Sequence, residues 1–233
     1  EYGINRLFSM QTHSGGLGYW PGGHASNFGS AYAGMVLAIA KSRGHTVPSR
    51  PMDGLKKYLI KLVKRPVNGK WAWRDHCLAL YTLTLLDAPQ AAIHEKAFAQ
   101  RDKLPESART LLAMAVAKID GPDEMIEALL KVKAEDEKRA FEYYWNAHQQ
   151  LAMRLMARCL QNNTHPKAVQ TAGMITDAAR DGHWGTTFGN AWVIYALATY
   201  DQQVTTGVSV NGTLVLGEQE HTFELNEKKR SAA

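Results

Sequence analysis

Residues 31–40 read AYAGMVLAIA, residues 55–62 read LKKYLIKL and residues 77–86 read CLALYTLTLL. The first and third stretches are apolar almost all round a helix, so each predicts a helix that is buried on most sides. The second stretch places leucines on one helical face and lysines on the other, which is typical of a helix that covers a core from outside. Together they predict a buried helix, an outer helix and a second buried helix in succession.

The same alternation continues to about residue 203, after a helical remnant over residues 1–11. Further buried helices are predicted within 111–117, 151–160 and 191–198, and further outer helices around 93–97, 125–130 and 169–175. Proline and glycine separate the segments. Stacked helix pairs of this kind form either an open solenoid or a closed ring. We predict an all-α fold of stacked helix pairs, either a solenoid or an α/α toroid, with a short C-terminal β extension.

The pattern changes to that of strands after residue 204. Val208, Val210, Leu214 and Leu216 alternate with other residues, and the pair Asn211-Gly212 predicts a hairpin turn between two strands. We therefore divide the chain into a helical domain, residues 1–203, and a β segment, residues 204–233, that leads into a following domain. Because the chain begins at Glu1 within a helical pattern and without a leader sequence, we expect it to be part of a longer protein.

Composition excludes several classes of protein. The chain has 233 residues, of which 45% are hydrophobic and 21% charged, as in ordinary globular proteins. The uncharged stretch 14–40 is interrupted by glycine and proline, so no transmembrane segment is expected. Two cysteines, Cys77 and Cys159, are too few for a disulfide framework, and we expect both thiols to be buried.

Positive charge is concentrated between Lys41 and Arg74, where ten basic residues accompany a single acidic one. Such a field could attract nucleic acid or anionic lipid. The segment has no nucleic-acid fold signature, and its aromatic residues do not interleave with the basic ones. We therefore expect a solvated outer face and no nucleic-acid partner.

Aromatic residues precede the predicted buried helices. They are Tyr19-Trp20, Trp71 with Trp73, Tyr143-Tyr144-Trp145, and Trp184. If the buried helices run parallel, these residues lie at one end of the ring, beside helix N-termini. The two interpretations are that each ring fills its own loop, or that the rings form an apolar surface that shelters a reactive group.

Two motifs carry a resemblance to a known family. Residues 10–23 read MQTHSGGLGYWPGG, and residues 182–198 read GHWGTTFGNAWVIYALA. Both motifs resemble the thioester domain of the alpha-2-macroglobulin family, in particular its bacterial members, and they occur in the family's order. With the helix alternation between them, the resemblance covers about residues 1–203.

The resemblance implies an α/α toroid of about six helix pairs, so the first pair is expected upstream of Glu1. In the family that pair carries the thioester, formed between a Cys and a Gln in a Cys-x-Glu-Gln motif, which is absent from this chain. The family implies an inhibitor that traps an attacking protease covalently once, and not a turning-over enzyme.

Particular residues follow from the resemblance. Because a thioester must be kept from water before it reacts, Tyr19, Trp20 and Trp184 are expected to form a sheltering aromatic rim. In complement-type relatives a His assists acyl transfer to hydroxyls, and His76 is the candidate here. The family further implies a periplasmic, envelope or secreted bacterial protein, with proteases and other domains of the same parent chain as partners. No catalytic residue, cofactor or metal is expected.

Alternatives remain open at this stage. The order Asp75-His76-Cys77 with a distant His148 fits the zinc ligand spacing of protein prenyltransferases. A carbohydrate-active toroid would need paired acids at the aromatic end, for which Asp75, Asp181 and Glu142 are available. A thioester-free envelope scaffold or partner-binding module of the same family is the third alternative.

Overall fold

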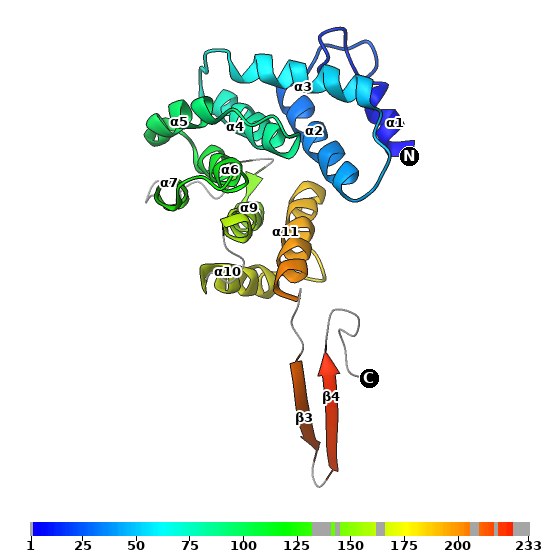
Figure 1. Ribbon diagram of the computed structural model, residues 1–233, viewed down its shortest axis with the longest axis vertical. Coiled ribbons are helices and arrows are strands. Elements are labelled where there is room, and N and C mark those ends of the chain that lie inside the picture. The colour runs from blue at the N-terminus through cyan, green and yellow to red at the C-terminus, as the bar shows by residue number, and fades with distance from the viewer. Residues whose placement is uncertain are drawn as a thin grey trace.

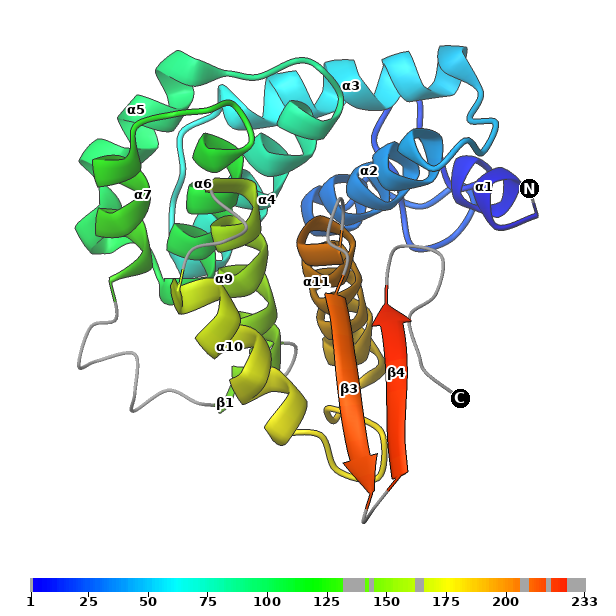
Figure 2. The same ribbon diagram turned by 60° about the horizontal axis from the view of Figure 1, so that its bottom comes forward.

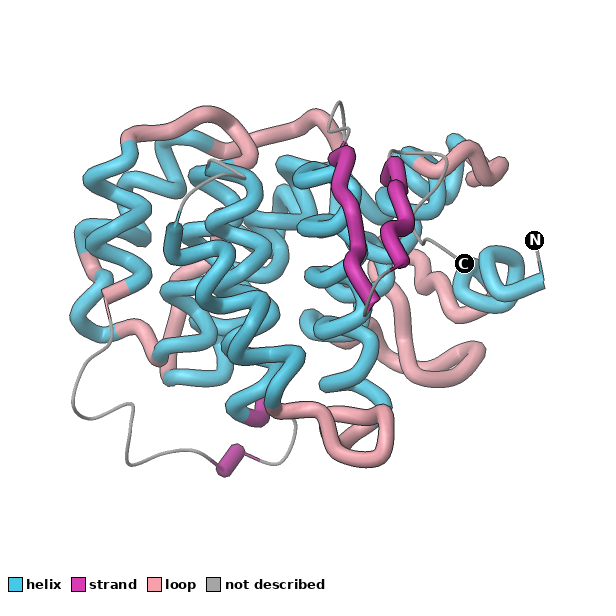
Figure 3. Tube along the Cα trace, turned by 90° about the horizontal axis from the view of Figure 1, so that it is seen from below, coloured by secondary structure: helices cyan, strands magenta, loops and turns pink. Residues whose placement is uncertain are grey.

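The computed structural model is mostly helical, and it describes residues 2–131, 141–142, 145–161, 166–205, 210–216 and 219–225. The helices of these ranges are α1 (Tyr2–Phe8), α2 (Asn27–Ser42), α3 (Ser49–Val63), α4 (Lys70–Leu85), α5 (Ala91–Ala99), the 3-10 turn η1 (Arg101–Lys103), α6 (Glu106–Ala117), α7 (Asp123–Leu130), α9 (Ala147–Gln161), α10 (Pro166–Asp177) and α11 (Thr187–Thr205). Seen from below, they make up most of the molecule (Figure 3).

The helices form an inner and an outer series. Along the inner series, α2 packs on α4, α4 on α6, α6 on α9 and α9 on α11. The outer helices cover them: α3 packs against α2 and α4, α5 and α7 against α6, and α10 against α9 and α11. In Figure 1 the outer helices follow one another along the outside of an arc. The predicted succession of buried and outer helices is therefore observed, and the mostly helical fold is confirmed.

Burial explains why the inner helices are apolar all round. In α6 every residue from Ser107 to Ala117 is buried, because α4, α5, α7 and α9 all pack against it. Small residues allow close approach where inner helices meet. A Cβ at Gly34 of α2 would lie 2.9 Å from Cγ2 of Thr82 of α4, whose hydroxyl donates a 2.9 Å hydrogen bond to the Ala31 carbonyl.

The β hairpin after the helices differs from the prediction in the position of its turn. The strands β3 (Val210–Leu216) and β4 (Gln219–Leu225) form an antiparallel hairpin beyond the helices (Figure 1). The turn prediction was wrong, because Asn211 and Gly212 lie within β3 and pair with Glu224 and Phe223.

A second, very short strand pair precedes α9. Phe141–Glu142 (β1) pairs with Trp145–Asn146 (β2), so Trp145 precedes α9 within a strand. The sequence pattern indicated strands only after residue 204, so it missed this short pair. Tyr143 and Tyr144, which sequence placed in the aromatic series, lie outside the described residues.

Candidate functional site

The segment before α2 is a loop that is tied to the helix it precedes. Leu17 is buried, and its amide donates a 2.8 Å hydrogen bond to the Ser30 hydroxyl of α2. The Gln11 side-chain amide donates to the Gly15 and Pro51 carbonyls at 2.9 and 2.7 Å. Gly15 has φ +88°, and a Cβ there would lie 2.3 Å from the Gly54 carbonyl oxygen, so this position requires glycine. The loop is thereby held rigidly against α2 and α3.

This anchored loop presents two aromatic side chains to solvent. Tyr19 is 65% exposed and Trp20 66% exposed, and their ring centroids lie 6.4 Å apart. Tyr19 stands beside the start of α2, since one of its ring carbons is 3.9 Å from the position of a Cβ at Gly29. Exposure of two large rings on an ordered loop is unusual for a surface that stays in water.

Trp184, the third expected rim residue, begins the turn into α11. Its amide donates to the Asn190 side-chain oxygen at 2.7 Å, and its indole N–H donates to the Ile175 carbonyl of α10, also at 2.7 Å. The half-buried ring is therefore directed toward α10. Among the described residues, no ring-ring contact joins Trp184 to Tyr19 or Trp20.

Four aromatic rings join the starts of α2 and α11. Phe28 and Tyr32 of α2 stack at 5.9 Å, and Phe188 of α11 meets them edge-on at 5.9 and 5.0 Å. Trp192, one turn further along α11, lies 6.5 Å from Tyr32. Burial raises the pKa of the Tyr32 hydroxyl. We call Phe28, Tyr32, Phe188 and Trp192 the aromatic cluster.

The aromatic cluster shows how two inner helices are oriented. At the opposite end of the same pair, Arg43 after α2 donates a 2.9 Å hydrogen bond to Gln202 near the end of α11. The contacts at both ends indicate that α2 and α11 run in the same direction, and Figure 2 shows the two helices as neighbours. Their N-termini thus lie together, with Tyr19 close by.

Arg74 contacts the aromatic cluster, and this contact places the start of α4 beside the starts of α2 and α11. Its guanidinium carbon lies 5.4 Å from the Phe28 ring centroid and 4.4 Å from that of Trp71, which is 55% exposed. Contacts of this kind are favourable because the ring face is electron-rich. Burial raises the pKa of the neighbouring Asp75 carboxyl, an effect that Arg74 opposes. Three inner-helix N-termini therefore share one aromatic surface with a cation in it.

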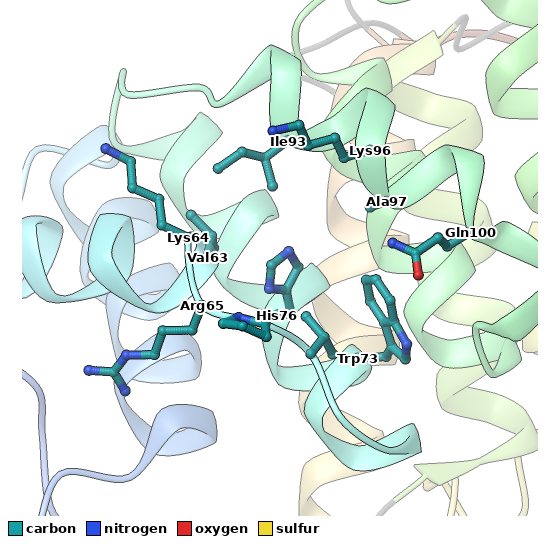
Figure 4. Close-up of a pocket in the computed structure, with 11 residues that line it drawn as sticks. Val63, Lys64, Arg65, Trp73, His76, Ile93, Lys96, Ala97 and Gln100 are labelled. Atoms are coloured by element: carbon teal, nitrogen blue, oxygen red, sulfur yellow. The ribbon is translucent and has the colours of Figure 1, made fainter.

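Trp73 and His76 face the other way. They lie on the side of α4 turned toward α5, with their rings edge-to-face at 5.6 Å, and both line a pocket away from the aromatic cluster (Figure 4). His76 is 5% exposed, and burial, together with nearby His94, lowers its pKa to about 4. The structure therefore separates His76 from the expected rim residues.

Both cysteines are buried, as predicted. Cys77 is fully buried and Cys159 is 4% exposed, and burial raises the pKa of both thiols, that of Cys159 to about 11. Within the described part of the chain, no three His, Cys, Asp or Glu side chains cluster as metal ligands, so the zinc alternative finds no site there. None of the described helices is long and apolar enough to cross a bilayer.

Sequence reasoning missed Arg74 and the aromatic cluster as parts of this end. The available signal was spacing: Phe28 and Tyr32, like Phe188 and Trp192, are four residues apart, which places each pair on one helical face. Pairing of the two faces across the molecule could not be read from local spacing.

Alternating inner and outer helices, with aromatic residues at the inner N-termini, define the class of this chain: a helical fold built from stacked helix pairs. Comparison with known proteins confirms the predicted resemblance. The chain is 28% identical over 219 residues to an alpha-2-macroglobulin homologue of Yersinia pestis, a match that covers 85% of this chain and 10% of that protein. The chain is thus a homologue of part of a bacterial alpha-2-macroglobulin. No protein-family model matches it.

Solved structures agree on the fold. Trypsin-activated alpha-2-macroglobulin from Escherichia coli superposes with a TM-score of 0.70 at 17% identity, over 97% of this chain and 17% of that one. Salmonella alpha-2-macroglobulin reacted with methylamine gives 0.72 at 19% identity, over 96% and 16%. The native E. coli protein from domain MG7 to the C-terminus gives 0.70 at 17% identity, over 98% and 38%. The chain therefore spans a small part of each relative.

Proposed function

We propose that this chain is the thioester-type domain of an alpha-2-macroglobulin-like protease inhibitor. In this proposal residues 1–203 form most of an α/α toroid, residues 204–233 lead into a following domain, and the parent protein acts in the periplasm, in the envelope or after secretion. Its partners would be attacking proteases, and it would react with each once instead of turning over. The homology to a bacterial alpha-2-macroglobulin carries this proposal. Relatives of the same fold are described as activated by trypsin and by porcine elastase.

The exposed aromatic residues at the inner-helix N-termini support a physical role for this domain, which is to keep water from a reactive group. Tyr19, Trp20 and Trp71 expose large apolar surfaces near the starts of α2 and α4, and the aromatic cluster joins α2 to α11. A surface of this kind excludes water from a group that rests on it. We propose that Tyr19 and Trp20 cover a thioester contributed from upstream of Glu1, and that Trp184, which precedes α11 and is hydrogen-bonded to α10, belongs to the same rim. His76 is buried on another face of α4, which argues against a role in acyl transfer at this rim.

The first test is to read the gene sequence upstream of the codon for Glu1. Codons that precede Glu1 are expected to encode Cys-x-Glu-Gln, and the parent protein should then form an SDS-stable conjugate with trypsin that methylamine pretreatment abolishes. A parent without this motif, or without the conjugate, would refute covalent capture and favour the thioester-free scaffold.

The second test addresses the rim. In the parent protein, a Tyr19→Ala/Trp20→Ala variant should react with methylamine about tenfold faster than wild type before protease is added, because the thioester loses its cover. Val169→Ala, which removes an exposed apolar side chain of α10 far along the chain, is the control and should react at the wild-type rate. Equal rates in all three proteins would exclude a sheltering role for the loop.

A further inference from the structure

A pocket of about 490 Å³ lies between the end of α3, the first turns of α4 and one face of α5. Figure 4 shows its lining, which includes Lys64, Arg65, Trp73, His76, Lys96 and Gln100. The described contacts of the aromatic cluster involve none of these six residues. We call this space the α3–α5 pocket.

The α3–α5 pocket has both apolar and polar parts in its wall. Val67, Ile93 and the buried Trp73 supply hydrocarbon and indole surface. Among the polar groups, the His76 imidazole is directed into the pocket in Figure 4. His76 forms no hydrogen bond with any other described residue, although it is 5% exposed. An imidazole that reaches a pocket can exchange a hydrogen bond with a molecule bound there.

Three cations border the pocket. Lys64 and Arg65 come from the end of α3, and Lys96 comes from α5. The Lys64 and Arg65 side chains extend away from the centre in Figure 4, so they bring positive charge to the rim without filling the space. No acidic residue is among those that line it. The potential in the pocket therefore favours an anion.

Apolar walls, one inward-facing imidazole and a cationic rim are complementary to one class of ligand. We propose that the α3–α5 pocket binds a small apolar carboxylate, with its hydrocarbon or aromatic part against Trp73, Val67 and Ile93 and its carboxylate within reach of His76, Gln100 and Lys96. Neutral imidazole donates one N–H to such a group, and the Gln100 amide can donate another. This proposal does not depend on the proposed protease trap.

The test uses phenylacetate as the probe and NMR of the 233-residue chain as the readout. Phenylacetate should shift the Trp73 indole and His76 imidazole resonances, with a dissociation constant of about 1 mM, as suits a ligand of this size. Phenylacetamide has the same ring without the charge, and acetate has the charge without the ring. Each should bind at least about tenfold more weakly, which is one 1.4 kcal/mol step in affinity. Equal binding of phenylacetamide would overturn the proposal.

Variants separate the pocket from general surface charge. Lys64→Gln/Lys96→Gln should weaken phenylacetate binding at least about fivefold, because it removes two rim cations. Lys57→Gln/Lys61→Gln removes the same charge from exposed positions of α3 that do not line the pocket, and should change the affinity less than about twofold. Equal losses in the two variants, or shifts that spare Trp73 and His76, would refute the site. His76→Gln should also bind more weakly, but the rim variants carry the test if that protein does not fold.

Discussion

At the scale of single residues, His76 and His94 are both buried, and the His94 imidazole forms no hydrogen bond with another described residue. His94 of α5 is 2% exposed, and neither of its ring nitrogens has a hydrogen-bond partner among the described residues. Burial lowers its pKa to about 4, and the same effect, aided by His94, lowers that of His76 to about 4. Both imidazoles are therefore neutral in the folded protein at neutral pH.

We predict that acid destabilises the fold through these two residues. Their folded pKa values lie below the unfolded value of about 6.5, so the unfolded chain binds more protons, and stability is lost as pH falls from about 6.5 toward 4. The loss should be about 3 kcal/mol per histidine at pH 4. Urea unfolding at pH 7.5, 5.5 and 4.5 measures it. His94→Gln should flatten the profile, whereas His13→Gln, at an exposed position, should leave it unchanged. Parallel profiles for wild type and His94→Gln would contradict this account.

At the scale of elements, Arg154 joins three helices. From α9 its guanidinium donates to Glu106 of α6 at 3.0 and 2.5 Å, and to the Leu130 carbonyl at the end of α7 at 2.6 Å. The two charged side chains are 16% and 22% exposed. A partly buried pair with extra hydrogen bonds contributes more than a surface ion pair does.

We predict that Arg154→Met lowers the free energy of unfolding by about 2 to 3 kcal/mol, because it leaves the Glu106 carboxylate partly buried and unpaired. The matched control is Lys167→Met, which removes a 60% exposed lysine 3.4 Å from Glu127. Its cost should stay within about 0.5 kcal/mol. Urea denaturation of both variants provides the comparison. Similar costs for the two would mean that Arg154 is an ordinary surface charge.

At the scale of the whole molecule, contact between α2 and α11 brings the two ends of the helical domain together. The Arg43–Gln202 hydrogen bond joins residues 159 positions apart in the chain. Trp192 is 1% exposed, and it lies where the aromatic cluster meets the interior. This contact places the loop with Tyr19 and Trp20 beside the start of the last inner helix.

We predict that Trp192→Ala costs about 3 to 5 kcal/mol through loss of buried area and the cavity that remains. Hydrogen exchange should show protection lost in α11 and kept in α6, because α6 is held mainly by α4, α5, α7 and α9. Ile194→Ala, at a 60% exposed position of the same helix, should cost less than about 0.5 kcal/mol. Uniform loss of protection across both helices would show that α11 does not open separately.

Particular residues show how far sequence reasoning reached. The lysine and leucine pattern of 55–62 predicted the outer helix α3 correctly, because helical periodicity is a local property. Asn211-Gly212 has the strongest local turn signal in the tail, yet pairing over the whole of β3 and β4 places it within a strand. Trp71 and Trp73 are two residues apart and were expected on one surface, but helical geometry sends them to different faces of α4.

Sequence alone was enough to establish the helical class, the order of buried and outer helices, the burial of both cysteines and the resemblance to bacterial alpha-2-macroglobulins. All of these depend on side-chain character and on spacings of a few residues. The shared N-terminal surface of α2, α4 and α11, the separation of His76 from it and the α3–α5 pocket emerged with the three-dimensional packing. They depend on contacts between segments far apart in the chain, whose free energy is set by shape and burial that no local pattern encodes.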